Sequence, residues 1–149
     1  MRIAIAADHG GFEYKQQLIP LLLKWGHEIM DYGTYSEDSV DYPDYIGPLA
    51  KDVAKGYFDR GIVICGTGIG VSIVSNKVEG IRCALVSQVE VAKITREHND
   101  SNILAMGARV IDFDTCQKIT KTWLDTDFSK EERHIQRIEK ISEFEKTKV

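Results

Sequence analysis

A cysteine stands directly before a glycine-rich loop in Cys65-Gly66-Thr67-Gly68-Ile69-Gly70. The apolar run Ile62-Val63-Ile64 predicts a buried strand before it, and a helix is expected after it. Such a loop points several backbone N–H groups into one concavity at a helix N-terminus, which suits an anion. The same N–H dipoles stabilise a thiolate. The segment therefore indicates a reactive Cys65 beside an anion cradle, with a tight turn and an inert buried cysteine as the alternative.

The glycine pattern differs from nucleotide-binding loops. A dinucleotide fingerprint requires a third glycine where this chain has Val71, and an acid after the next strand, where it has Val86-Ser87-Gln88. A Walker loop requires a Gly-Lys-Ser or Gly-Lys-Thr sequence, which is absent. A phosphatase loop built on Cys, five residues and Arg also fails at Val71. Nicotinamide dinucleotides and nucleoside triphosphates are therefore disfavoured.

Two histidines are candidates for acid–base chemistry. His9 follows the first expected strand in Asp8-His9-Gly10-Gly11, and His98 ends an expected helix in His98-Asn99-Asp100. Ligands of open parallel sheets bind outside the carboxyl ends of the strands, so we expect both histidines to converge with Cys65 on one crevice there. A structural histidine is the alternative for each. No two histidines have a metal-ligand spacing, and no metal is expected.

Three arginines are candidates for anion recognition. Arg133 and Arg137 lie four residues apart on one face of the last expected helix, next to His134, and Arg109 follows the fifth expected strand. Paired guanidinium groups match phosphate geometry. A solvated helix face with Glu partners is the alternative for the pair, and a simple loop charge is the alternative for Arg109.

Alternating strands and helices must position these residues. Apolar periodicity and glycine stops predict strands over 2–7, 28–31, 62–64, 82–86 and 103–106, with helices over 13–25, 45–55, 70–77 and 89–97. The pattern predicts one domain over residues 1–149 of the α/β class, a Rossmann-like three-layer sandwich with a parallel sheet of about five strands. Two further helices end the chain, the first capped by Asp114 and the second by the capping box Ser129-Lys130-Glu131-Glu132.

Charge and composition exclude several classes of function. The 149 residues carry 19 Lys and Arg against 23 Asp and Glu, and no basic run occurs, so binding to nucleic acid is not expected. No apolar stretch approaches the ~20 residues that cross a bilayer, and the first residues lack a signal peptide, so we expect a soluble, cytoplasmic protein. Cys65, Cys83 and Cys116 are too few and too widely spaced for a disulfide framework or a zinc site.

Short motifs along the chain, from residue 2 to about residue 145, together resemble the type B ribose-5-phosphate isomerase family. The resemblance implies at least a homodimer without a cofactor, in which neighbouring subunits complete each active site. A homodimer and a homotetramer both stay open. The motifs, in order, are Asp8-His9-Gly10-Gly11, Gly33-Thr34 with Asp41-Tyr42-Pro43, Cys65 with its glycine loop, Asn76-Lys77, Gly80-Ile81-Arg82, His98-Asn99-Asp100 and Gly107-Ala108-Arg109.

The family interconverts ribose 5-phosphate and ribulose 5-phosphate through an enediolate. By resemblance, Cys65 is the base that moves the proton between C2 and C1, Thr67 orients the thiol, and His98 opens the sugar ring. The substrate contacts implied are Asp8, Tyr42 and Asn99 for sugar oxygens, Gly66, Gly68, Ile69 and Gly70 for the enediolate, and His9, Arg109, Arg133 and Arg137 for the phosphate.

Three other functions stay open at this point. One is a subunit of galactose-6-phosphate isomerase, against which His98-Asn99-Asp100 and the Arg133 and Arg137 pair argue. Another is isomerisation of a six-carbon sugar such as allose 6-phosphate. The third is a non-catalytic sugar-phosphate sensor, which has no need of Cys65 together with His98. The pentose phosphate pathway follows from the resemblance alone.

Overall fold

Five parallel strands form one sheet in the computed structural model, which describes residues 1–147. Their order in the sheet is β2-β1-β3-β5-β4, so β5 lies between β3 and β4. The predicted parallel sheet of about five strands is confirmed. The strands are β1 (Arg2–Ala7), β2 (Glu28–Asp31), β3 (Arg60–Cys65), β4 (Cys83–Leu85) and β5 (Ile103–Gly107).

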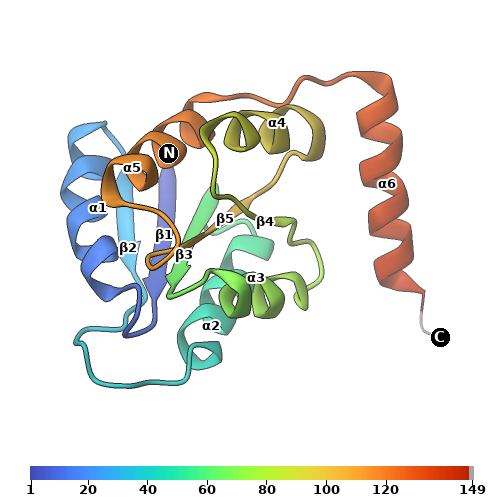
Figure 1. Ribbon diagram of the computed structural model, residues 1–149. Coiled ribbons are helices and arrows are strands. Elements are labelled where there is room, and N and C mark those ends of the chain that lie inside the picture. Colours follow the sequence, from blue (N-terminus) through green and yellow to red (C-terminus); the bar gives the residue numbers. More distant parts are fainter. Residues whose placement is uncertain (148–149) are drawn as a thin grey trace.

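Helices cover both faces of the sheet, which gives the predicted three layers (Figure 1). Side chains alternate across β1, so Ile3 and Ile5 pack on one face, Ala4 and Ala6 pack on the other, and all four are fully buried. One face carries α1 (Phe12–Lys24), α4 (Val89–Asn99) and α5 (Phe113–Asp125), and the other carries α2 (Pro43–Ala54) and α3 (Ile69–Asn76).

The last helix, α6 (Glu132–Lys146), stands beside the three layers and has its first turns next to α4 (Figure 1). Near its far end, Glu145 accepts a hydrogen bond from the Gly80 N–H at 3.0 Å. Between α6 and β4 lies an open hollow of about 410 Å³, into which Ile141 and Phe144 project. None of the helices within residues 1–147 combines the length and the apolar character needed to span a membrane.

Both predicted helix caps are wrong. The Asp112 carboxylate caps α5 by accepting the Thr115 N–H at 2.8 Å, whereas Asp114 lies inside the first turn and pairs with Lys118 at 2.9 Å. Ser129 donates its hydroxyl hydrogen to the Glu97 carbonyl at 2.7 Å and so ties the segment before α6 to α4. The helix itself begins after Glu131, without a side-chain cap.

Candidate active site

The loops that follow β3 and β5 lie against each other at the carboxyl edge of the sheet. The Ala108 N–H donates to the Cys65 carbonyl and the Arg109 N–H donates to the Gly66 carbonyl, both at 2.9 Å. The Arg109 guanidinium reaches back over the glycine loop, with Nη1 3.1 Å from the place where a side chain on Gly66 would begin. The expected place of Arg109, beside the loop of Cys65, is therefore the observed one.

Cys65 is buried and its sulfur faces the glycine loop. The Gly68 N–H donates to Cys65 Sγ at 3.1 Å. Gly68 adopts a left-handed conformation with φ +80°, which glycine reaches without strain, and that conformation begins α3. The glycine loop therefore places a hydrogen-bond donor against the Cys65 sulfur, which is the group expected to act as a base at this edge.

The other two cysteines are held as thiols. Burial raises the pKa of Cys83 to about 12, against the opposing effect of a hydrogen bond with Ser75. Burial likewise raises the pKa of Cys116 to about 12, against a hydrogen bond with Thr120. The expectation of a small core residue is confirmed for Cys116, which is fully buried, whereas Cys83 is half-buried. Cys65 is left as the cysteine positioned for chemistry.

The start of α3 offers backbone donors to an anion. The Thr67 hydroxyl accepts the Ile69 N–H at 3.2 Å, so this side chain is engaged with the helix start, and its expected orienting effect on the thiol stays a prediction. The Gly70 N–H has no acceptor within residues 1–147, as is usual in the first turn of a helix. One backbone donor at the start of α3 is therefore free, and the anion cradle itself stays a prediction.

Asp8, His9 and Tyr42 line an open hollow of about 640 Å³ in front of the same edge. Asp8 Oδ1 accepts the Gly10 N–H at 2.8 Å, which fixes the turn after β1. His9 Nδ1 accepts the Val40 N–H at 3.3 Å, so the proton of the neutral ring belongs on Nε2, where it can be donated to a ligand. We call Asp8, His9, Tyr42, Cys65, residues 66–70 and Arg109 the carboxyl-edge cluster.

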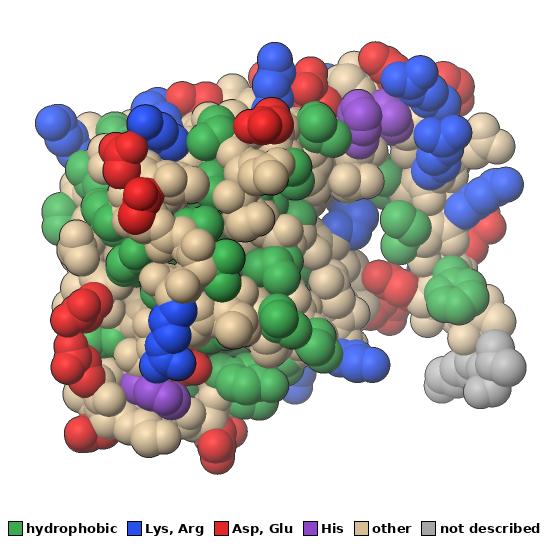
Figure 2. All heavy atoms as spheres, viewed as in Figure 1, with side chains coloured by type: hydrophobic (Ala, Val, Ile, Leu, Met, Phe, Trp, Pro, Cys, Tyr) green, Lys and Arg blue, Asp and Glu red, His purple; other side chains and the backbone are tan. Residues whose placement is uncertain are grey.

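His98 and Asn99 do not join this cluster, so the expectation that they converge with Cys65 in one chain is wrong. In a parallel sheet, the helix between two strands runs back to the amino edge, and the last turn of α4 ends there. Asn99 accordingly shares a hollow with Cys83, which begins β4, and with Asn76, which ends α3. Figure 2 shows histidine side chains at opposite ends of the visible face.

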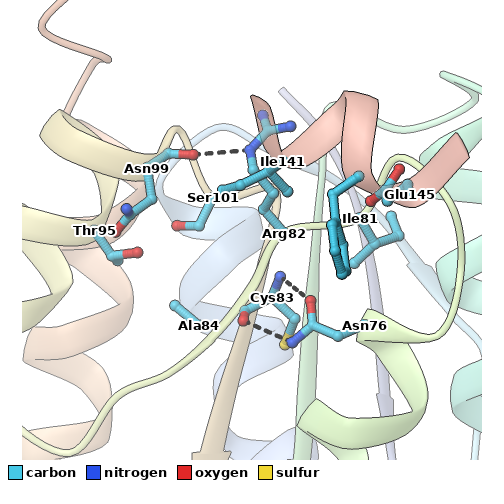
Figure 3. Close-up of a pocket in the computed structure, with 11 residues that line it drawn as sticks. Asn76, Ile81, Arg82, Cys83, Ala84, Thr95, Asn99, Ser101, Ile141 and Glu145 are labelled. Atoms are coloured by element: carbon cyan, nitrogen blue, oxygen red, sulfur yellow. Dashed lines mark hydrogen bonds between the residues drawn. The ribbon is translucent and has the colours of Figure 1, made fainter. Parts of the chain in front are cut away.

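Arg82, which sequence reasoning did not single out as a site residue, holds the end of α4. Its Nε donates to the Asn99 carbonyl at 2.8 Å (Figure 3). Its Nη2 donates to the Asp100 carbonyl at 2.9 Å. The buried Arg96 adds a bond from Nη1 to Asp100 Oδ1 at 2.8 Å. The Arg82 bonds satisfy carbonyl groups at the helix end that have no partner within the helix, and together with the Arg96 bond they hold the backbone next to His98 in place. In the sequence, only the motif Gly80-Ile81-Arg82 points to this role of Arg82.

The first turns of α6 bring a second group of polar side chains beside His98. The rings of His98 and His134 stack with centroids 4.2 Å apart and an interplanar angle of 20°. Arg133 and Arg137 are exposed on the same helix, as expected. We call His98, Asn99, Arg133 and Arg137 the helix-end cluster. One chain therefore presents two separate clusters, one with the thiol and one with His98 and the paired arginines.

Comparisons with known proteins identify the family of the chain. Residues 3–141 match the family described as Ribose/Galactose Isomerase. The chain is 42% identical to ribose-5-phosphate isomerase B of Escherichia coli, over 97% of this chain and 96% of that protein. The structure of Clostridium thermocellum ribose-5-phosphate isomerase B is 49% identical, with a TM-score of 0.95 and 98% of each chain covered. That of Mycoplasma genitalium ribose-5-phosphate isomerase B with bound ribulose-5-phosphate is 36% identical, with a TM-score of 0.94, over 99% of this chain and 97% of that one.

Proposed function

The chain belongs to the ribose/galactose isomerase family, and we propose that it interconverts ribose 5-phosphate and ribulose 5-phosphate. The observation that carries the proposal is the Cys65 sulfur, which accepts the Gly68 N–H at 3.1 Å beside the Gly70 N–H, which has no acceptor within residues 1–147. A base and an oxyanion site at one point are what proton transfer between adjacent carbons requires. Residues 1–149 then form one isomerase domain of the cytoplasmic pentose phosphate pathway.

In the proposed reaction, the open-chain aldose binds with C2 next to Cys65. The thiolate removes the C2 proton, the electron pair of that bond forms the C1–C2 double bond of the enediolate, and the carbonyl oxygen becomes negatively charged. The N–H groups of residues 66–70 stabilise that charge, a role in which one lost donor costs about 2.7–4 kcal/mol. The hydroxyl proton on the C2 oxygen passes to the negatively charged C1 oxygen. The thiol then returns its proton to C1, and the electron pair left on the C2 oxygen forms the C2 ketone. No cofactor takes part in this sequence.

The proposed active site combines the carboxyl-edge cluster of one chain with the helix-end cluster of a second copy. Support comes from the position of His98 and Cys65 at opposite edges of the same sheet, because neither cluster is complete alone. His98 opens the sugar ring by moving a proton between the anomeric hydroxyl and the ring oxygen, and Asn99 binds a sugar oxygen. Arg133 and Arg137 join His9 and Arg109 around the phosphate.

The test is isomerase activity on ribose 5-phosphate, allose 6-phosphate and galactose 6-phosphate, measured in parallel with chelator present. We expect a preference for ribose 5-phosphate that survives the chelator. A preference for either six-carbon sugar would assign the chain to that substrate instead. If none of the three sugar phosphates is isomerised while calorimetry still measures binding of ribose 5-phosphate, the chain is a sugar-phosphate sensor.

Gly70→Ala is expected to weaken substrate binding, because a methyl group there would lie 2.6 Å from the ring of Tyr42. The ring must move away from the hollow in front of Cys65, and we expect KM for ribose 5-phosphate to rise about tenfold, the equivalent of one lost hydrogen bond. Steady-state kinetics measure this change.

The matched control is Gly47→Ala in α2, the helix that follows Tyr42. A methyl group on Gly47 has nothing within 4 Å, and alanine favours a helix over glycine, so KM is expected to stay the same and the thermal midpoint to rise slightly. An unchanged KM in Gly70→Ala would remove Tyr42 from the substrate site.

A further inference from the structure

His134 is the one buried residue of α6 within residues 1–147. The other side chains of this helix are exposed or half-buried, including its three isoleucines. Burying a polar imidazole has a cost that an apolar side chain of similar size avoids, unless its polar atoms are engaged. A helix that needed only an apolar anchor against α4 would be served better by phenylalanine. A buried histidine at this position is therefore expected to have partners both for its ring face and for its ring nitrogens.

The ring face has a partner in the helix-end cluster. His134 stacks on His98 with ring centroids 4.2 Å apart and an interplanar angle of 20°. His98 is itself exposed and ends α4, so few other groups restrict its ring. The stack therefore limits the orientations that the His98 ring can adopt.

The ring nitrogen has a partner in the same cluster. Arg133 Nε donates to His134 Nε2 at 3.4 Å, while Arg133 Nη2 pairs with Glu131 at 3.0 Å. Burial lowers the pKa of His134, and the positive charges of His98 and Arg133 lower it further against the opposing effect of Glu131. The ring is therefore neutral near pH 7, and its unprotonated Nε2 can accept the hydrogen bond from Arg133.

We propose that His134 is a positioning residue that aligns His98 through its ring face and Arg133 through Nε2. The inference rests on the proposed function, in which His98 opens the sugar ring and Arg133 binds the phosphate. One buried side chain thereby fixes the position of the His98 ring on α4 relative to the Arg133 guanidinium on α6. His134 itself has no contact with substrate in this proposal.

Two substitutions separate the two contacts. His134→Phe keeps an aromatic face against His98 and removes the acceptor for Arg133, so KM for ribulose 5-phosphate is expected to rise about tenfold. His134→Gln keeps an acceptor and removes the aromatic face, so KM for ribulose 5-phosphate is expected to stay within about twofold of the original value. Its defect should instead show in ring opening.

Ring opening is read from the consumption of ribose 5-phosphate at rising enzyme concentration. When the enzyme opens the ring, the rate rises in proportion to enzyme; when it cannot, the rate levels off at the spontaneous rate of ring opening. We expect levelling in His134→Gln and proportionality in His134→Phe. Gln136→Ala, an exposed change on the same helix, is the control and should behave as the unaltered protein does. Circular dichroism and solution mass verify that each variant folds and assembles.

Equal losses in both His134 variants, or unaltered kinetics in both, would overturn the positioning role. His98→Asn and Arg133→Ala are measured alongside to separate this failure from that of the proposed function. If these two variants show the levelling and the raised KM while both His134 variants are normal, only the positioning role fails. If they also behave normally, the roles proposed for His98 and Arg133 fail, and the inference fails with them.

Discussion

Cys65→Ala is expected to lower kcat for ribose 5-phosphate by about 10²–10⁴, the usual contribution of a positioned base. The alanine side chain cannot accept the C2 proton, while the donors of residues 66–70 and the arginines that bind the phosphate are untouched. KM is therefore expected to stay close to its original value. Steady-state kinetics give kcat and KM, and calorimetry with ribulose 5-phosphate verifies that the variant binds substrate.

Cys83→Ala and Cys65→Ser are the matched controls. Cys83 begins β4 away from the carboxyl-edge cluster, and burial holds its pKa at about 12, so its replacement should leave kcat unchanged. Serine at position 65 keeps the size of the side chain but gives a far weaker acid at neutral pH, so its kcat should be as low as that of the alanine variant. Near-normal turnover in Cys65→Ala would show that another group is the base.

Mixing two impaired variants is expected to restore activity on ribose 5-phosphate at enzyme concentrations where spontaneous ring opening limits His98→Asn. In a mixed dimer of Cys65→Ala and His98→Asn, one site combines both defects and the other combines an intact Cys65 with an intact His98. Random pairing places one such intact site in half of the dimers, so activity should recover to about a quarter of the original level. The measurement is isomerase activity after the two variants are unfolded and refolded together.

Two controls define the outcome. Each variant refolded alone must keep its own low rate, and a mixture that is combined without unfolding should recover only as fast as subunits exchange. Absence of any recovery, with mixed dimers present by mass, would mean that each active site is built within one chain. The proposed division of the site between two copies would then be wrong.

Residues directly after strands could be placed from the sequence. A buried strand such as 62–64 has a direction along the chain, so the position of Cys65 at the carboxyl edge follows from the pattern alone. The same argument places Asp8 and His9. The position of His98 follows from an equally simple rule, because a helix between parallel strands returns to the amino edge. His98 ends such a helix and therefore lies at the edge opposite Cys65.

Other features depend on contacts between distant parts of the chain and were not predicted. The apolar pattern of a strand does not encode its neighbours, so the place of β5 between β3 and β4 could not be deduced. Lys15 lies fully buried in α1 and pairs with Asp31 at 2.7 Å, although a lysine in a helix usually lies in solvent. Asp112 and Asp114 both have the chemistry of a cap, and only the start of α5 distinguishes them.

Because the two clusters lie at opposite edges of one chain, the proposed site has a fixed distance between the base and the arginines that bind the phosphate. The reacting carbon is held by one copy and two of the phosphate-binding arginines come from the other, so the span available to the sugar is set by how closely the copies dock. The way in which the two copies dock then decides whether a five-carbon or a six-carbon sugar phosphate fits the site. Exposed apolar residues such as Ile73 on α3, which lie outside both clusters, would tune substrate length from a distance by altering that docking.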